Sequence, residues 1–312
     1  MIEFVKNPKF DFLGKARYFG VFSVLLIAAG IVSISRPDGL RYGVEFSGGT
    51  QLVAQFERTP QIDKIRDAVA AVSPGSVIQT YDQPAKNQVL IRLAGESAEE
   101  GAELTVAAER TLKALSELYP DNPVLESSSE IVGPVVGAEL RRKAIQLTVL
   151  GLLFQLIYIG VRFGGGVWGS AAALAALHDV LVTLGLLSFT GYEITLNVIA
   201  ALLTLVGYSV NDTIVIFDRI RENLRQRRKD PFPKLVNESV NQTLTRTLIS
   251  SGTTFLAVLG LYVFGGEVLN GFAFTMVVGI VAGTYSTIYI ATPLVVWWKQ
   301  RDARAVSAKA AL

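Results

Sequence analysis

The run Gly-Tyr-Ser-Val-Asn-Asp-Thr at residues 207–213 places an acid inside a long apolar segment. A charge in hydrocarbon is costly, so the carboxylate of Asp212 is a candidate for function by default. On a helix, Tyr208 and Ser209 share the face of Asp212 and would be its hydrogen-bonding neighbours. With the adjacent Asn211 they form a set of supporting candidates around this acid.

Arg246 stands at the start of the next apolar segment, which returns from the same side of the membrane. From the rise per residue of a helix, we expect Arg246 and Asp212 to lie at a similar depth. A fixed cation at that level would keep the carboxylate ionised, and protonation of the acid would release the arginine. Such a pair can carry protons. It can equally be a structural bond between two helices, and the residues alone leave both interpretations open.

Asp179 is the second acid within an apolar segment, about twelve residues from that segment's start, and His178 precedes it. Adjacent side chains leave a helix about 100° apart, so we expect that these two do not face one partner. Asp179 is therefore a further supporting candidate, and His178 is a weaker one.

Six apolar runs surround these residues, each about 17 to 25 residues or longer, which is the length a helix needs to cross the hydrocarbon core. The first follows a basic segment but lacks a clear cleavage site, so we expect a retained span rather than a signal peptide. The predicted spans are Tyr18–Ile34, Ala144–Val161, Val167–Phe189, Ile194–Phe217, Thr247–Phe264 and Gly271–Trp298.

Composition excludes several other classes of protein. Half of the residues are hydrophobic and 18% are charged, whereas soluble domains carry nearer a quarter. The net charge of +2 gives no basic field of the kind that binds nucleic acid. With no cysteine and a single histidine, we expect no metal site and no cofactor. Because no nucleophile–base set or phosphate loop occurs, an enzyme is the least expected class.

The distribution of Lys and Arg predicts how the chain crosses the membrane. Four lie before the first span, one in the connection between the second and third spans, eight between Arg219 and Arg246, and four after Trp298. The short loops Thr190–Glu193 and Gly265–Asn270 contain none. Both termini are thus predicted to be cytoplasmic, and the segment between the first two spans is predicted to be external.

That external segment alternates short strands with amphipathic helices in the order βαββαβ, the order of a ferredoxin-like split unit. The second predicted helix opens with Ser97 and Glu100 at the spacing of a capping box. The predicted strands are Gly49–Glu57, Val77–Tyr81, Gln88–Leu93 and Val124–Ser129, and the predicted helices are Pro60–Val72 and Ala98–Leu118.

The predicted fold is therefore an all-α membrane bundle of six helices with an inserted α+β ferredoxin-like domain. The Gly279-x-x-x-Gly283 spacing in the last span favours close packing of helices. The expected divisions are a cytoplasmic tail (1–17), a first span (18–34), the external domain (38–136), a five-helix bundle (144–298) and a second cytoplasmic tail (299–312).

Several motifs are spread through most of the chain: residues 207–223 (GYSVNDTIVIFDRIREN), 241–247 (NQTLTRT), 132–137 (VGPVVG), 264–267 (FGGE), 283–286 (GTYS) and 43–49 (GVEFSGG). In these motifs the chain resembles the SecF family, membrane subunits of the bacterial protein-export machinery. Glu45 stands where the family pattern has Asp, which keeps the charge.

The resemblance implies one six-helix half of a resistance–nodulation–division type transporter in the bacterial inner membrane, with SecD as the other half. It implies work with the SecYEG channel on an exported polypeptide, driven by the proton gradient and in contact with membrane lipid. Carried over by motif, Asp212 would be the proton-carrying acid and Arg246 its charged partner.

Two other functions stay open. The first is half of a small-molecule/proton antiporter of the same superfamily, although such pumps usually carry a larger external domain than the one predicted here. The second is a structural scaffold for other membrane subunits, in which Asp212 and Arg246 only hold helices together.

Overall fold

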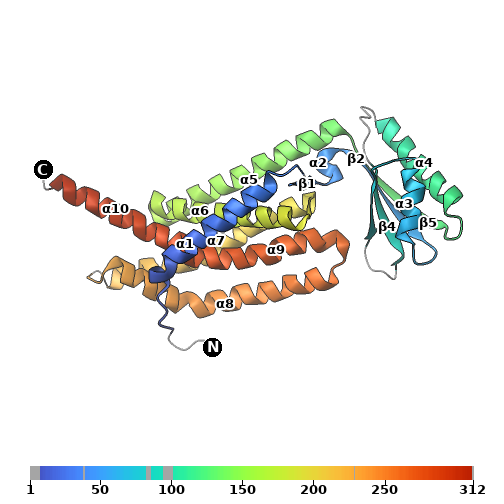
Figure 1. Ribbon diagram of the computed structural model, residues 1–312. Coiled ribbons are helices and arrows are strands. Elements are labelled where there is room, and N and C mark those ends of the chain that lie inside the picture. Colours follow the sequence, from blue (N-terminus) through green and yellow to red (C-terminus); the bar gives the residue numbers. More distant parts are fainter. Residues whose placement is uncertain (1–7, 38, 82–85, 94–100, 228, 311–312) are drawn as a thin grey trace.

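A computed structural model describes residues 8–37, 39–81, 86–93, 101–227 and 229–310. Long helices lie side by side in one bundle, and a smaller domain of strands and helices projects from one end (Figure 1). The turn between α7 and α8 and the C-terminal helix lie at the opposite end of the bundle. The bundle helices are α1 (Phe12–Ile34), α5 (Pro134–Phe163), α6 (Gly166–Thr190), α7 (Leu196–Gln226), α8 (Phe232–Phe264), α9 (Glu267–Ser286), η2 (Thr287–Ala291) and α10 (Thr292–Ala310).

In the part of the chain that the structure describes, six helical segments are long and apolar enough to cross a membrane. Each of the six predicted spans corresponds to one of these segments, so the number of spans is confirmed; five lie wholly within them, and the fourth, predicted from Ile194, begins at Leu196 because Ile194 belongs to a short strand. Several helices continue beyond the apolar runs, because nothing in the flanking polar sequence stops them. Helix α1 begins at Phe12, where the side chain of Asp11 accepts a hydrogen bond from the Gly14 N–H. Helix α5 begins ten residues before the predicted span, at Pro134.

The helix ends follow local sequence signals. Thr195 caps α7, and its hydroxyl accepts a hydrogen bond from the Val198 N–H. Helices α5 and α6 both end at glycines in the left-handed conformation, Gly164 and Gly191, which L-residues adopt at a cost. These signals set where α6 and α7 begin and end, and α6 carries Asp179 while α7 carries Asp212.

The domain between the first two spans, predicted above to be external and called the external domain for that reason, is a four-stranded antiparallel sheet in the order β3-β4-β2-β5, packed against two helices. All four predicted strands and both predicted helices are present. The proposed cap of the second helix at Ser97 and Glu100 lies outside the described residues. Inward side chains of β2, β4 and the two helices form its core. The elements are β2 (Gly49–Phe56), α3 (Ile62–Ala70), β3 (Val77–Tyr81), β4 (Gln88–Leu93), α4 (Gly101–Leu118) and β5 (Val124–Val132).

A two-stranded parallel pairing joins the external side of the bundle to the chain that leaves the first span. β1 (Arg41–Tyr42) pairs with β6 (Glu193–Ile194), which lies between α6 and α7. The short helix α2 (Val44–Ser47) follows and packs on α5. Two-residue strands carry no detectable periodicity, so the sequence did not predict this connection.

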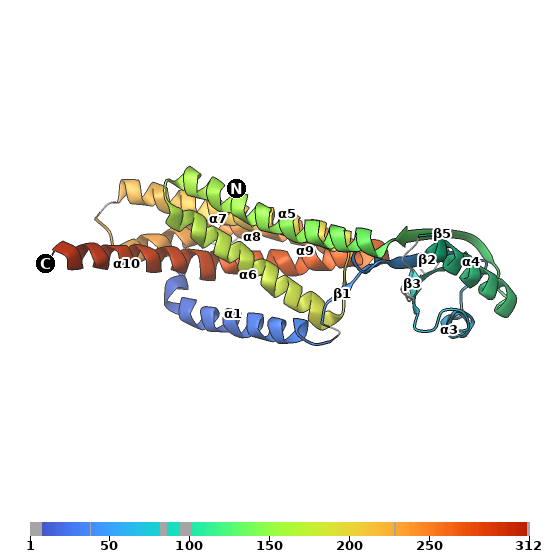
Figure 2. The same cartoon turned by 90° about the horizontal axis from the view of Figure 1, so that it is seen from above.

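Helix α1 lies on one flank of the bundle beside α6, as seen from above (Figure 2). The two backbones nearly touch at Gly30 and Gly185, where a Cβ added to Gly185 would lie 2.7 Å from the Gly30 Cα. On α9, Gly279 and Gly283 face Leu205 and Ser209 of α7. The predicted small-residue spacing therefore serves packing within this chain.

Candidate functional site: two buried carboxylates in the helix bundle

Asp212 lies inside the bundle on α7, with 3% of its surface exposed. Its carboxylate faces α8, where the Ser251 hydroxyl donates to Oδ2 at 2.6 Å and the Ser250 hydroxyl contacts Oδ1 at 3.5 Å. The next residue of α7, Thr213, shares a hydrogen bond of 3.0 Å with Thr287 of η2. The hydrogen-bonding partners of Asp212 are therefore neutral hydroxyl groups of α8, and its neighbour Thr213 is bonded to η2.

Arg246 lies on α8 one to two turns from these serines, and its side chain is exposed. Its side chain lines a cleft together with Ser250, and no ion pair joins it to Asp212, whose carboxylate contacts the two serines. Arg246 and Asp212 are therefore not in direct contact. The reason is geometric, because Ser250 and Ser251 present their hydroxyls to the carboxylate while Arg246 points into a cleft.

That cleft has a volume of about 1430 Å³ and opens at the end of the bundle opposite the external domain. Arg246 and Ser250 form part of its lining, so the cleft reaches a side chain that contacts Asp212. The rest of the lining mixes basic and amide side chains with two acids, Asp11 and Glu238, and a few apolar residues. The basic and amide side chains include Lys9, Arg219, Arg227, Lys234, Asn237 and Asn241.

The segment before α1 closes one side of this cleft. Asn237 accepts from the Phe12 N–H at 2.9 Å, and Asn241 accepts from the Phe10 N–H at 2.9 Å. Both amides also donate to the Phe10 carbonyl at 2.9 Å. Two asparagines one helical turn apart on α8 therefore bind the extended backbone much as a neighbouring strand would.

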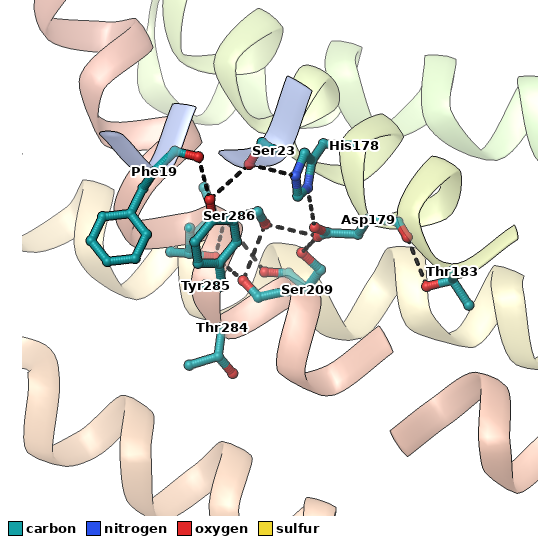
Figure 3. Close-up of polar contacts among 12 residues, drawn as sticks. Phe19, Ser23, His178, Asp179, Thr183, Ser209, Thr284, Tyr285 and Ser286 are labelled. Atoms are coloured by element: carbon teal, nitrogen blue, oxygen red, sulfur yellow. Dashed lines mark hydrogen bonds and ion pairs between the residues drawn. The ribbon is translucent and has the colours of Figure 1, made fainter. Parts of the chain in front are cut away.

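Asp179 lies on α6 and is fully buried. Figure 3 shows its carboxylate at the centre of a polar cluster that joins several helices. The hydroxyls of Ser209 on α7 and Ser286 on α9 donate to Oδ2 at 2.5 and 2.9 Å, and His178 Nδ1 lies 2.9 Å from Oδ1.

The cluster continues from His178 to the first span. His178 Nε2 lies 3.0 Å from the Ser23 hydroxyl on α1, which lies 2.7 Å from the Tyr285 hydroxyl on α9. Tyr285 in turn donates to the Phe19 carbonyl of α1. His178 and Asp179 contact different partners, as expected from the angle between adjacent residues of a helix. The expectation did not include their direct bond to each other, which forms because rotation about their side-chain torsions offsets the 100° between their Cα–Cβ bonds.

The supporting candidates around Asp212 fall in three different places. Ser209 contacts Asp179 and not Asp212. Tyr208 is partly buried and donates to the Ser250 carbonyl at 3.2 Å, which ties α7 to α8 beside the acid. Asn211 is exposed on the outer face of α7. Of these three residues, Tyr208 alone borders the surroundings of Asp212.

Sequence reasoning missed Ser250 and Ser251 on α8 and Ser286 on α9, which contact the two acids. It also missed Ser23 on α1 and Tyr285 on α9, which continue the cluster from His178. Each is a polar residue inside an apolar segment. Hydroxyl groups in a membrane helix usually bond across helices or back to their own backbone. A polar residue inside an apolar segment was therefore the sequence signal that could have identified these residues.

The chemistry that this arrangement supports is the binding and release of protons. Two carboxylates and an imidazole lie within apolar helices, and hydroxyls at hydrogen-bonding distance surround them. Groups of three or more metal-ligating side chains do not occur among the described residues. The fold and these sites define a multi-pass membrane protein with ionisable groups in its helix bundle and a soluble domain at one end.

Comparison with known proteins agrees with this class. Residues 112–301 match the family described as protein export membrane protein SecD/SecF, C-terminal, and residues 38–60 match the SecD/SecF GG motif. The protein translocase subunit SecF of Calditerrivibrio nitroreducens is 43% identical over 299 residues, covering 94% of this chain and 96% of that protein.

The fused protein translocase subunit SecDF of Thermus thermophilus is 41% identical over 311 residues, which is 97% of this chain and 40% of that protein. The crystal structure of Thermus SecDF superimposes with a TM-score of 0.80 at 39% identity, and covers 94% of this chain and 39% of the fused chain. The bundle therefore has the helical fold of resistance–nodulation–division transporters.

The chain belongs to the SecF family of protein translocase subunits, and it is a component of protein export.

Proposed function

We propose that this chain works with SecD and uses the proton gradient to assist movement of an exported polypeptide through the SecYEG channel. In this proposal Asp212 is the acid that takes up and releases the proton. The observation that carries it is a buried carboxylate, bonded to hydroxyls of a second helix, one of which lines a polar cleft.

The neutral surroundings of Asp212 suit a carboxylate that changes its charge. Ser250 and Ser251 can donate to the ionised acid, and their oxygens can accept from the protonated one. Arg246 lines the cleft and does not neutralise the acid through a contact ion pair. A permanent contact pair would hold the acid ionised, whereas a cation at longer range favours the ionised form without preventing protonation.

SecD is the proposed partner because the relatives of this chain include the fused SecDF, in which it corresponds to about two-fifths of the length. The bundle would then be one half of a twelve-helix unit in the bacterial inner membrane. Both termini would be cytoplasmic and the external domain periplasmic, as the Lys and Arg distribution indicates. No cofactor, covalent chemistry or nucleic acid enters the proposed cycle.

The external domain is proposed to be ferredoxin-like. Its element order βαββαβ and its strand order β3-β4-β2-β5 support that assignment. In the role that we propose, it is a binding or mechanical module that moves with the bundle.

The test is export into membrane vesicles with and without a proton gradient. Asp212→Asn should lose the gradient-dependent part of export and keep the ATP-dependent part, with SecD still co-purifying. Asp218→Asn is the matched control, because Asp218 is on the same helix but half-exposed, and its nearest cation, Arg162, lies 3.8 Å away. Normal gradient-dependent export by Asp212→Asn would refute the proposal.

The same vesicles separate the two alternatives. For a scaffold, export falls only in variants from which SecD is lost on purification. For a small-molecule antiporter, the Asp212→Asn variant keeps full export but loses proton-coupled uptake of a small molecule.

A further inference from the structure

The hydrogen bonds that run from Phe19 to Asp179 can be assigned a direction from one end. The Phe19 carbonyl can only accept, so the single O–H of Tyr285 donates to it. The Ser23–Tyr285 contact of 2.7 Å then requires the Ser23 O–H as donor. With its own hydrogen used, the Ser23 oxygen can only accept from its remaining neighbour.

That neighbour is His178 Nε2, 3.0 Å away, which must therefore carry a proton. The other ring nitrogen, Nδ1, lies 2.9 Å from Asp179 Oδ1. If Nε2 carries the only ring proton, a lone pair on Nδ1 would face a carboxylate oxygen, which is repulsive. A second proton between Nδ1 and Oδ1 removes this repulsion, whether it resides on the imidazole or on the acid.

We propose that His178 and Asp179 form a proton-binding site separate from Asp212, and that the bound proton ties the first span to α6 and α9. With the proton bound, the pair has no net charge, as imidazolium and carboxylate or as two neutral groups. Its release to water leaves neutral imidazole and carboxylate, with one negative charge. This proposal does not rest on the role of Asp212.

The groups that face the pair come from several helices. Helix α1 presents Ser23, α7 presents Ser209, and α9 presents Tyr285 and Ser286. Tyr289 of η2 is the next titratable group, with its ring 5.6 Å from that of Tyr285. Helices α5 and α10 also pack on α6, and among the described side chains they present no hydrogen-bonding partner to the pair. No second charged group therefore compensates the pair at contact distance.

Loss of the proton would reverse part of the chain of hydrogen bonds. Nδ1–H would donate to Asp179, which leaves a lone pair on Nε2 facing Ser23. The Ser23 O–H would then turn to Nε2 and leave Tyr285, and the link between α1 and α9 would lose one bond. Because the same pair holds Ser209 and Ser286, the change would also reach α7 and α9.

The chain contains one histidine, so nitrogen NMR of ¹⁵N-histidine-labelled protein in lipid reports on this site alone. We expect a protonated Nε2 at neutral pH and a bare Nε2 once the pH is raised far enough to remove the shared proton. A bare Nε2 together with a protonated Nδ1 at neutral pH would overturn the proposal. So would an Nε2 that stays protonated at every pH at which the protein remains folded.

Tyr285→Phe tests the direction of the hydrogen bonds. Without the tyrosine hydroxyl, Ser23 is free to donate to Nε2, so the ratio of protonated to bare Nε2 at a given pH should fall by about tenfold, the effect of one hydrogen bond. Tyr289→Phe removes a neighbouring hydroxyl outside this chain of bonds and should leave the ratio unchanged. Equal ratios in wild type and Tyr285→Phe would contradict the assignment.

Two acid variants separate this site from the proposed function. Asp179→Asn should abolish the pH-dependent change at Nε2, since the amide N–H can donate to Nδ1 and Nε2 then keeps its proton at every pH. Asp212→Asn should leave the His178 signal and its pH dependence as in the wild type, whatever it does to export. A change at Nε2 with pH that persists in Asp179→Asn, or that is lost in Asp212→Asn, would show that the proton is not bound by the His178–Asp179 pair alone.

Discussion

At the level of single residues, the two acids of the bundle differ in what surrounds them. Asp179 accepts hydrogen bonds from three side chains on three helices and lies away from the cleft. Asp212 is bonded to two serines of one helix, and one of these serines lines the cleft. The first arrangement suits a site that holds helices together, and the second suits an acid that exchanges protons with water.

The shorter of the two serine contacts to Asp212 should matter for proton uptake. Ser251→Ala removes the 2.6 Å hydrogen bond, so we expect gradient-dependent export to fall by roughly tenfold, the effect of about 1.4 kcal/mol. Thr253→Ala on the same helix is the control, because the Thr253 hydroxyl bonds only to carbonyls of its own helix. Wild-type export by Ser251→Ala would show that this bond does not tune the acid.

The positions of the acids were predictable from sequence, and their partners were not. A carboxylate between apolar residues is visible in one segment, whereas Ser251 lies 39 residues from Asp212 and meets it only through the packing of α7 and α8. The same holds for Ser209, which lies near Asp212 along the helix but turns to Asp179. Which acid a serine hydroxyl contacts depends on how its helix is rotated in the bundle. The apolar periodicity of one helix does not determine that rotation.

At the level of elements, glycines set how closely the helices approach. The backbones of α1 and α6 meet at Gly30 and Gly185. A hydrogen bond of 2.9 Å between Ser33 and Ser188 lies near this contact. This contact brings α1 to the depth at which Ser23 reaches His178. Close packing of small residues is the main attraction between helices in lipid, since the apolar surroundings provide little hydrophobic drive.

A methyl group at this contact should therefore separate the two helices. Gly30→Ala places a Cβ 3.0 Å from the Gly185 Cα, so we expect destabilisation by about 1–3 kcal/mol and a lower midpoint of thermal unfolding in detergent. Gly20→Ala on the same helix meets nothing within 4 Å and is the matched control. An unchanged midpoint for Gly30→Ala would mean that α1 is held by other contacts.

Helices and strands of ordinary length followed from sequence because their apolar patterns repeat over many residues. The six spans and the strands β2 to β5 are of this kind. The β1–β6 pairing is two residues long, and the π-helical segment Thr287–Ala291 interrupts an otherwise continuous last span. Both depend on tertiary contacts, and π-helical turns often occur at functional sites.

At the level of the whole molecule, the external domain is attached to the bundle where α7 begins. The β1–β6 pairing joins the chain after the first span to Glu193 and Ile194, and Arg92 of β4 forms an ion pair with Glu193. The two side chains are only 17% and 20% exposed. A rotation of the external domain would therefore pull on the same helix that carries Asp212.

A charge exchange tests this attachment. Arg92→Glu and Glu193→Arg should each make the external domain more sensitive to protease, because each places like charges together. The double variant should restore resistance, with a coupling free energy of about 1 kcal/mol in a double-mutant cycle. The control is the same exchange at Arg66 and Asp63, an exposed pair within α3. Additive effects at Arg92 and Glu193 would show that the ion pair does not hold the domain.

The proposed function depends most on Asp212 as the acid that moves protons. Proton flux into proteoliposomes that contain this chain and SecD is the most direct measurement, with an imposed gradient and a pH-sensitive dye inside. We predict that Asp212→Asn abolishes the flux while SecD still co-purifies, and that Asp218→Asn leaves it at the wild-type rate. Wild-type flux through an intact Asp212→Asn complex would contradict the account.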